Sequence, residues 1–263
     1  MARLAEIPFI KGHGTANDFI LIPDFDDALT LSPQDVQWLC DRRRGLGADG
    51  VIRMAYDDAG LPFMDYRNAD GSVAEMCGNG ARVFLRYLHA KGMIDDHCLF
   101  RTRGGIREGW IHSDRSVTID MGSIQVRADA IEIQVDERTW TATSVDAPNP
   151  HAVVMVESLD HAGSLIDQPL VRPDRAFPDG VNVEFVEIID HDHVRMRVFE
   201  RGVGETMSCG TGACAVAAVI GNDVRIDVPG GTVFVSFDDR GFAHLRGPAD
   251  LVARGTVLLP VSD

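Results

Sequence analysis

The 263-residue chain lacks any apolar run that approaches the roughly 18 residues of a membrane-spanning helix. Its first residues, Met1–Pro8, contain no apolar stretch long enough for a signal peptide. The five cysteines are an odd number, and in a mid-sized chain without a secretion signal they indicate reduced thiols rather than a disulfide framework. We therefore expect a cytoplasmic protein.

Signatures of metal and cofactor binding are also missing. The sequence has no Cys-x-x-Cys motif, no metal-type Cys/His cluster, no phosphate loop and no pyridoxal signature. His191 and His193 are two residues apart, but no third ligand is spaced to help, so this segment is expected to be a solvated hairpin turn. We expect no metal and no cofactor.

One segment, Gly45–Gly50, formally matches the Gly-x-Gly-x-x-Gly pattern of dinucleotide-binding proteins. That fingerprint needs a strand before it and a helix after it. Here a helix is expected before the glycines, and the strand-like Val51–Tyr56 follows them. The glycines are better explained as a helix C-cap and a tight turn.

Positive charge is scarce, because 25 Lys and Arg face 40 Asp and Glu, and the net charge is −15. Nucleic acids and anionic membranes repel such a surface, so neither is expected as a partner. A content of 45% hydrophobic and 25% charged residues is typical of a soluble globular protein with an ample core. The length allows one large domain or two of ordinary size.

A short motif that occurs twice favours two domains. Cys77–Ala81 reads CGNGA, and Cys209–Ala213 reads CGTGA. The two cysteines are 209 − 77 = 132 residues apart, which is close to half of the 263-residue sequence. This separation is here called the repeat spacing. A helix-like run follows each copy, at Ala81–Ala90 and at Ala213–Ile220. The repeat indicates two similar domains, each presenting a thiol from the positive end of a helix dipole.

The segments around these helices are predicted to be short strands that do not alternate with helices as βαβ units would. They lie near residues 63–67, 99–102, 106–111, 117–120, 131–135, 224–228, 233–237 and 241–245. Residues 146–156 are expected to be a loop that leads into a strand, and residues 177–200 a strand that turns at 191–193 and returns. The expected fold class is therefore α+β: two pseudo-symmetric domains, each a curled, barrel-like mixed or antiparallel β-sheet around a central α-helix. Met121–Ser123 is the expected crossing point between the halves.

Two turns and one further helix can be placed in the sequence. Lys11–Ile22 is predicted to be two strands joined by a turn, with Asn17 as a turn-former. Ser32 as N-cap and Pro33 at the first helical position predict a short helix to Cys40, which is expected in the core. Asn149 precedes a proline, so it is held in an extended or turn conformation with its amide available for binding.

A cysteine before Gly-x-Gly at a helix start has a definite chemical meaning. The backbone N–H groups and the dipole are expected to lower the thiol pKa, and glycine lets a ligand carboxylate approach the same N–H groups. If two such thiols meet one carbon from opposite faces, one can remove a proton while the other delivers one. The N–H donors of Gly78, Asn79, Gly210 and Thr211 would then stabilise the carbanion.

Six short motifs, in four groups along the chain, together resemble the diaminopimelate epimerase family. They are Asn68–Ser72 with Cys77–Gly80, Asn149–His151, Asn182–Phe185, and Glu200–Thr206 with Cys209–Gly212. The resemblance extends from Lys11 to Gly247–Ala249. It implies a cofactor-independent two-base epimerase that interconverts LL- and meso-diaminopimelate in the synthesis of lysine and peptidoglycan precursors.

The resemblance also implies residue roles and domain bounds. Cys77 and Cys209 would be the acid–base pair, with His151 and Glu200 tuning them and holding the ammonium group. The first domain would comprise residues 1–122 plus 254–263, because the C-terminal strand returns to it, and the second residues 123–253. A small-molecule substrate and a second copy in a homodimer are the expected partners. The expected substrate-binding residues are Asn17, Asn68, Gly78, Asn79, Asn149, Asn182, Glu200, Arg201, Gly210 and Thr211.

Three departures from the family pattern concern the local backbone: Ala16 and Ala147–Pro148 stand where glycine is usual, and the helix after Cys209 is short, reaching only Gly221–Asn222. Two other functions remain open. One is another two-thiol racemase, acting on proline, hydroxyproline or histidine. The other is a thiol redox or small-ligand binding protein in which Cys77 and Cys209 form a switchable disulfide.

Overall fold

The computed structural model describes residues 3–221 and 223–261, and the chain divides into two compact units. Unit 1 comprises Met1–Ile119 and Pro248–Asp263, and unit 2 is Asp120–Gly247. The boundaries expected from the sequence lie three and six residues further along the chain. No described helix is long and apolar enough to cross a membrane.

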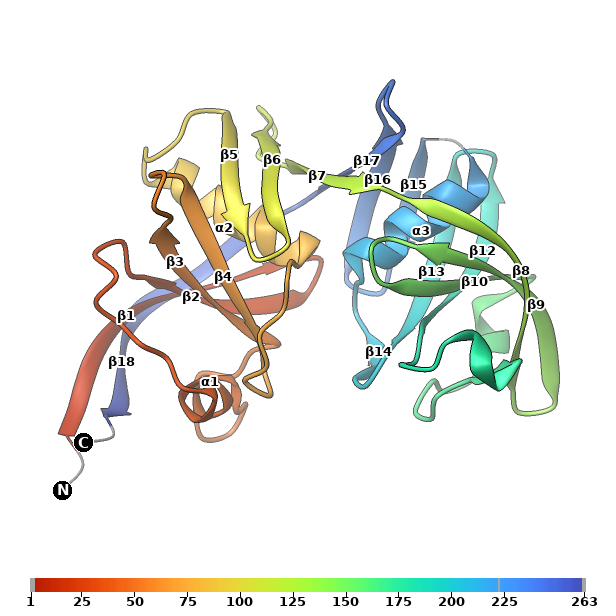
Figure 1. Ribbon diagram of the computed structural model, residues 1–263, viewed down its shortest axis with the longest axis horizontal. Coiled ribbons are helices and arrows are strands. Elements are labelled where there is room, and N and C mark those ends of the chain that lie inside the picture. The colour runs from red at the N-terminus through yellow and green to blue at the C-terminus, as the bar shows by residue number, and fades with distance from the viewer. Residues whose placement is uncertain (1–2, 222, 262–263) are drawn as a thin grey trace. The chain divides into compact units, whose positions relative to one another are not determined.

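Unit 1 is a curled mixed sheet that surrounds helix α2, Gly78–Ala90 (Figure 1). The strands follow one another in the order β18-β1-β2-β3-β4-β5-β6-β7; the β2–β3 and β4–β5 pairs are parallel and the others antiparallel. Their bounds are β1 Arg3–Gly14, β2 Asn17–Pro23, β3 Gly50–Tyr56, β4 Pro62–Asn68, β5 His97–Thr102, β6 Gly105–Ile111, β7 Val117–Ser123 and β18 Asp250–Val261.

Unit 2 repeats this plan around helix α3, Gly210–Ile220. Its order β8-β9-β10-β12-β13-β15-β16-β17 has the same sequence of pairings, with β10–β12 and β13–β15 parallel. The bounds are β8 Gln125–Val135, β9 Arg138–Asp146, β10 Pro150–Val156, β12 Asn182–Asp190, β13 His193–Glu200, β15 Val224–Val228, β16 Gly231–Phe237 and β17 Phe242–Gly247. Shorter elements are η1 Leu159–Ala162, β11 Leu170–Arg172, η2 Asp174–Ala176 and β14 Gly204–Thr206.

The expected fold class is confirmed. The repeat also holds residue by residue, because equivalent strand pairings recur at the repeat spacing. Phe19 pairs with Gly50 on β2 and β3, and one repeat spacing later His151 pairs with Asn182 on β10 and β12. The C-terminal strand β18 completes the sheet of unit 1.

The central helices are buried because the sheets wrap around them. In α2 the side chains of Val83, Phe84 and Leu88 are fully buried, and each stabilises unit 1 by roughly 1.5–3 kcal/mol. Helix α3 is made of small apolar residues and ends at Ile220, with Gly221 in the left-handed conformation as its C-cap. The expected short helix is confirmed up to Gly221, and Asn222 lies outside the described residues.

Helix α1 spans Pro33–Cys40 and begins with the predicted cap: the Ser32 hydroxyl accepts from the Asp35 N–H at 3.2 Å. Cys40 is buried, as expected. The predicted glycine C-cap is wrong, since Asp41 caps the helix with an extended backbone. The glycines instead form the tight turn that follows, where Gly47 adopts a positive φ of 73°.

Two turns carry residues for which the sequence raised a functional question. The segment after Asp190 is a β-hairpin turn, as expected; its exposed Asp190, His191 and Asp192 have ligand atoms within 4.8 Å of one another. The β1–β2 turn places Thr15 and Ala16 at positive φ, 50° and 61°. Ala16 thus adopts the conformation for which glycine is usual, at an energetic cost to the turn.

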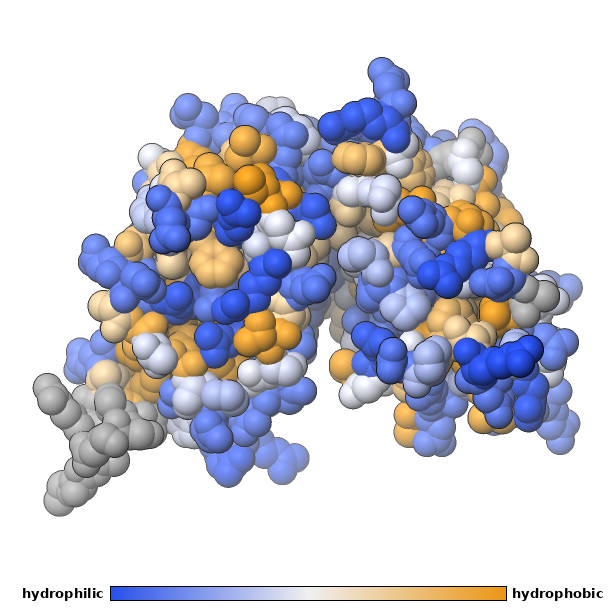
Figure 2. All heavy atoms as spheres, in the orientation of Figure 1, coloured by the Kyte–Doolittle hydropathy of each residue, from blue (hydrophilic) through white to orange (hydrophobic). Residues whose placement is uncertain are grey.

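Figure 2 shows hydrophilic side chains interspersed with apolar ones over the visible face.

Candidate active site

We call the residues around each of the two motif cysteines a half-site. The half-site of unit 1 is built around Cys77, the N-cap residue of α2. Its Sγ accepts a hydrogen bond from the Gly80 N–H at 3.4 Å and lies 3.8 Å from Asn17 Oδ1. Asn79 Nδ2 donates to the same Asn17 oxygen at 3.1 Å. The structure therefore brings three predicted residues, Asn17, Cys77 and Asn79, into direct contact.

Asp49 holds Asn17 in this position, although the sequence did not single it out. Asn17 Nδ2 donates to Asp49 Oδ2 at 2.8 Å, and the Asp18 N–H donates to the same oxygen at 3.1 Å. Arg42 bridges Asp18 and Asp49 with two 2.7 Å contacts. Burial by itself would raise the pKa of Asp18, but Arg42 and Lys11 outweigh it and lower that pKa to about 2.

Asn68 and Gly78 complete the predicted residues of unit 1. Asn68 ends β4, next to Gly50 in the sheet, and its Nδ2 donates to Ser72 Oγ at 3.0 Å. Gly78 is buried at the first position of α2. Its position at a helix N-terminus suits an anion because N–H groups there point away from the helix.

The half-site of unit 2 has Cys209 as the N-cap of α3. Its Sγ accepts from the Gly212 N–H at 3.4 Å, lies 3.4 Å from Thr211 Oγ1, and contacts Glu200 through a hydrogen bond. Gly210, also a predicted residue, is buried beside it.

The expectation that the helix start lowers the thiol pKa is wrong for Cys209. Burial and the negative charges of Glu200 and Glu184 raise the pKa of Cys209 well above 9.0, and the hydrogen bonds from Thr211 and Gly212 do not compensate. Desolvation of the thiolate therefore exceeds the stabilisation that a single helix terminus supplies. At neutral pH, Cys209 carries its proton.

His151 is fully buried on β10, between two side chains. Its Nδ1 lies 2.7 Å from Glu184 Oε1, and its Nε2 lies 3.0 Å from Asn149 Oδ1. The Asn149 amide is therefore engaged through its oxygen. Glu184 is also fully buried and was missed in the sequence.

Glu200, Asn182 and Arg201 lie at neighbouring strand ends of unit 2. The Thr206 hydroxyl donates to Glu200 Oε1 at 2.5 Å. Burial is the main cause that raises the pKa of Glu200, with a further contribution from the charge of Glu184. Asn182 Oδ1 accepts from the Arg201 N–H at 2.8 Å, while the exposed Arg201 guanidinium donates to the Asp179 carbonyl at 3.0 Å.

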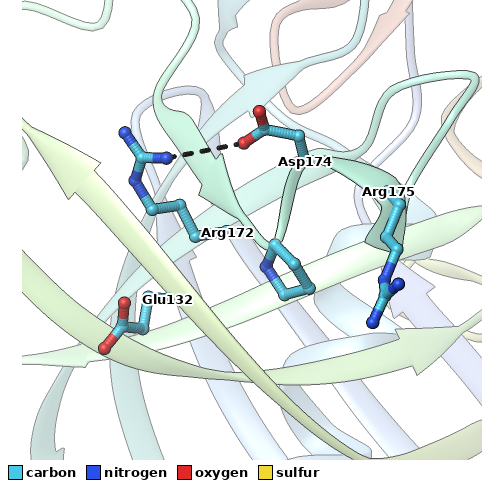
Figure 3. Close-up of a pocket in the computed structure, with 5 residues that line it drawn as sticks. Glu132, Arg172, Asp174 and Arg175 are labelled. Carbon is cyan, nitrogen blue, oxygen red and sulfur yellow. Dashed lines mark ion pairs between the residues drawn. The ribbon is translucent and has the colours of Figure 1, made fainter.

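A separate pocket of about 650 Å³ lies on unit 2, and no predicted site residue lines it. Its wall is formed by β8, β11 and the segment after β11, where Arg172 and Asp174 form an ion pair at 3.7 Å (Figure 3). Its other lining residues are Glu132, Pro173 and Arg175.

Comparison with known proteins identifies the family of the chain. The model of the diaminopimelate epimerase family matches residues 9–127 and 143–252. The chain belongs to this family. The diaminopimelate epimerase of Streptomyces coelicolor is 48% identical, over 95% of this chain and 94% of its own length.

Solved structures with low sequence identity share the fold of the family. A PhzF-family phenazine biosynthesis protein of Bacillus anthracis has a TM-score of 0.73 and 16% identity, covering 97% of this chain and all of the other. A hydroxyproline epimerase of Agrobacterium vitis, with bound trans-4-hydroxy-L-proline, has a TM-score of 0.70 and 15% identity, covering 99% and 95%.

Proposed function

We propose that this chain interconverts LL- and meso-diaminopimelate, as an isomerase of lysine and peptidoglycan-precursor synthesis that uses two cysteines and no cofactor. Membership of the diaminopimelate epimerase family supports the reaction and the substrate. The observation that carries the mechanism is the repeated half-site, in which Cys77 and Cys209 are both N-cap residues of the central helices.

The chemistry needs a thiolate and a thiol. One thiolate takes the α-proton and becomes a thiol, leaving the electron pair on the α-carbon and its carboxylate. The other thiol then delivers its proton to the opposite face of that carbon and becomes a thiolate, so the centre is inverted and the proton count balances. Cys209 suits the delivering role in the unliganded protein because its raised pKa keeps it protonated.

The carbanion would be stabilised at the two helix starts. Backbone N–H groups of Gly78, Asn79, Gly210 and Thr211 are the donors proposed for the carboxylate next to the reacting carbon. Burial of Gly78, Asn79 and Gly210 strengthens such dipoles, because less water competes with them.

The remaining polar residues would hold the rest of the substrate. Glu200 is the proposed partner of the ammonium group, with His151 tuning the thiols. Arg201 is proposed for the distal carboxylate, because its exposed guanidinium offers paired donors to that group. The amides proposed to orient both amino-acid centres belong to Asn17, Asn68, Asn149 and Asn182.

A substrate comparison tests this function against the racemase alternative. Purified reduced protein is incubated separately with LL-diaminopimelate, L-proline, trans-4-hydroxy-L-proline and L-histidine, and the products are separated on a chiral column. We expect conversion of diaminopimelate alone. Conversion of a ring-containing amino acid instead would overturn the proposal, and no conversion of any substrate would favour the thiol redox or ligand-binding alternative.

A cytoplasmic location, a homodimer and the division into residues 1–122 plus 254–263 and residues 123–253 stay predictions. Light scattering of the purified protein tests the homodimer, for which a mass close to twice that of the chain is expected. Limited proteolysis tests the division, because cleavage between the halves is expected at the junction of β7 and β8, around Ser123 and Ile124, rather than in the middle of a strand.

A further inference from the structure

The two helix starts pack on different kinds of side chain. A Cβ added to Gly80 would lie 2.9 Å from Met64 Cε, 3.1 Å from Ile52 Cδ1 and 3.4 Å from Phe19 Cε1. A Cβ added to Gly212, the equivalent glycine of unit 2, would lie 2.6 Å from Glu184 Oε1. Each helix therefore begins directly against side chains of the sheet, and the start of α3 is packed so tightly on Glu184 that a Cβ at Gly212 would force a shift.

The residues beneath the two helix starts are equivalent in the repeat. Glu184 follows Ile52 by one repeat spacing, and His151 follows Phe19 by the same separation. All four side chains are fully buried. Unit 1 thus has an apolar pair where unit 2 has a histidine and a carboxylate 2.7 Å apart.

The apolar pair Phe19 and Ile52 in unit 1 shows that this fold does not need charged side chains beneath the start of its central helix. A buried ionisable pair is expensive to desolvate, and well-packed apolar residues of similar volume are often at least as stable. Among the described residues, Glu184 Oε2 has no hydrogen-bond partner, which adds to the cost. A costly group that the fold can do without indicates a functional role.

We propose that Glu184 is a positioning residue of the unit 2 half-site: its carboxylate holds the His151 ring through Nδ1 and supports the helix start at Gly212. Nε2 of the ring is thereby directed at Asn149, a proposed substrate-binding residue. This inference rests on the proposed function for its effect on turnover. Its effects on His151 and on Cys209 do not depend on the substrate.

The charge of Glu184 also acts on its neighbours. It raises the pKa values of both Cys209 and Glu200. The charged or titratable groups that face Cys209 are Glu200 from β13 and Glu184 from β12, and His151 from β10 pairs with Glu184. Removing the Glu184 charge should therefore lower the pKa of the Cys209 thiol, because less negative charge opposes the thiolate.

The test compares three variants with the wild-type protein. Glu184→Gln keeps the shape and removes the charge, and the double variant His151→Phe/Glu184→Ile installs the pair of unit 1. Glu187→Gln is the matched control, because Glu187 lies on the same strand and its carboxylate accepts from Arg195 and from the Leu159 N–H, both at 3.4 Å. The measurements are kcat and KM, the pH dependence of Cys209 alkylation by mass spectrometry, the NMR signals of the His151 ring, and thermal unfolding.

For Glu184→Gln we expect kcat to fall at least about tenfold with a smaller change in KM, as is common when a supporting contact is lost. Cys209 alkylation should move to lower pH, and the His151 signals should shift. The double variant should unfold at the wild-type temperature or above it, yet lack activity. Glu187→Gln should match the wild-type protein in kcat, alkylation and ring signals.

Three results would overturn the role of Glu184. The first is wild-type kcat and an unchanged alkylation profile in Glu184→Gln. The second is lost activity in Glu184→Gln without any change in the His151 NMR signals or in the pH profile of Cys209 alkylation. The third is failure of both Glu184 variants to fold, since the His151–Glu184 pair would then be structural. If the wild-type protein does not act on diaminopimelate, the proposed function fails, but alkylation and NMR still decide the role of Glu184.

Discussion

At the scale of single residues, burial decides the state of the thiol at Cys209. The residue is six per cent exposed and faces two carboxylates, so the thiolate is disfavoured despite the helix start. The dipole effect could be predicted from the motif alone. The opposing effects come from Glu200 and Glu184, which lie on earlier strands of the chain, and only the folded sheet brings them to the cysteine.

Replacing either cysteine by serine should greatly slow proton transfer. A hydroxyl is a far weaker acid than a thiol, so Cys77→Ser and Cys209→Ser should each lower kcat by roughly 10²–10⁴-fold. Circular dichroism should show an unchanged fold, because each substitution only replaces one sulfur atom by oxygen. Cys98→Ala is the control, since Cys98 lies on β5 outside both half-sites, and its activity should stay near that of the wild-type protein.

Replacing Glu200 by glutamine should cost activity but increase stability. Burial, followed by the charge of Glu184, raises the folded-state pKa of Glu200 above 4.5. The folded protein then holds this proton more tightly than the unfolded chain, so Glu200 lowers the free energy of unfolding as pH rises from 4.5 through the folded pKa. Glutamine does not ionise, so the free energy of unfolding of Glu200→Gln does not fall in this way as pH rises. The Oε1 atom of the glutamine can still accept a hydrogen bond from the Thr206 hydroxyl.

Thermal unfolding at several pH values checks this prediction. The melting temperature of Glu200→Gln should exceed that of the wild-type protein by an amount that grows between about pH 4.5 and pH 8, while kcat/KM falls by about 10²-fold or more. A variant that is less stable than the wild-type protein at pH 8 would mean that ionised Glu200 stabilises the fold.

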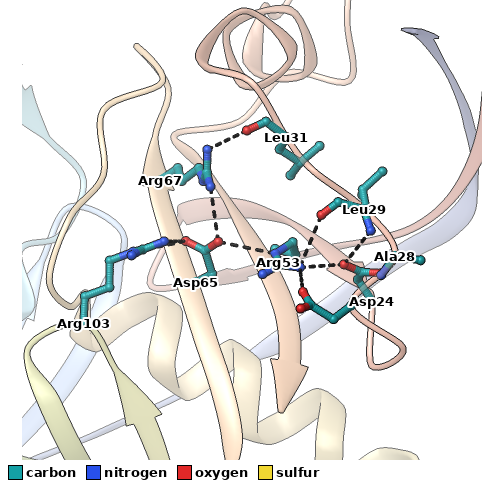
Figure 4. Close-up of polar contacts among 9 residues, drawn as sticks. Asp24, Ala28, Leu29, Leu31, Arg53, Asp65, Arg67 and Arg103 are labelled. Atoms are coloured by element: carbon teal, nitrogen blue, oxygen red, sulfur yellow. Dashed lines mark hydrogen bonds and ion pairs between the residues drawn. The ribbon is translucent and has the colours of Figure 1, made fainter. Parts of the chain in front are cut away.

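At the scale of elements, β4 carries a buried carboxylate that the sequence did not distinguish from a surface one. Asp65 is one per cent exposed and is contacted by Arg103 at 2.8 Å, Arg67 at 3.3 Å and Arg53 at 3.4 Å (Figure 4). Arg53 also reaches Asp24 at 2.7 Å, which ties the segment before α1 to the sheet. Burial alone would raise the pKa of Asp65, but the hydrogen bond from Arg103 and the charges of Arg67 and Arg103 outweigh it and lower that pKa.

Replacing Asp65 by asparagine should therefore destabilise unit 1. Removing one partner of a buried ion pair costs roughly 3–5 kcal/mol, and because water reaches the three guanidinium groups we expect about 2–3 kcal/mol in urea unfolding at pH 7. The wild-type advantage should disappear as pH falls through the folded pKa, below 3.8, because Asp65 then becomes protonated. Asp58→Asn, in the exposed β3–β4 turn, should change stability little, and equal losses in both variants would contradict the network.

Local elements were largely predictable because their signals are local. Ser32 and Pro33 predicted the start of α1, and the two Cys-Gly-x-Gly motifs predicted the starts of α2 and α3. The end of α1 was mispredicted, because its last carbonyl groups accept hydrogen bonds from a loop that extends to Ala48 rather than from a glycine cap. Such loop contacts depend on tertiary packing and leave no periodic pattern in the sequence.

At the scale of the whole molecule, a repeat of two short motifs predicted two similar sheets around two helices. An alignment of the two halves residue by residue, at the same repeat spacing, would have shown that Glu184 stands at the position equivalent to Ile52. Asp49 was missed for a related reason: its contact with Asn17 joins the ends of two strands that are far apart in the sequence. The substrate roles proposed for the asparagines rest on the family resemblance, because amide side chains are as suited to turns as to ligands.

We propose that two thiols, one from each unit, act on one carbon. This proposal is tested most directly by incubating LL-diaminopimelate with the enzyme in heavy water and following both isomers by mass spectrometry during the first few per cent of conversion. We predict one deuterium in the newly formed meso isomer and none in the remaining LL isomer, because the group that delivers the proton has exchanged with solvent. Equal labelling of both isomers would indicate a single base, and an unlabelled product would contradict proton delivery from a solvent-exchanged thiol.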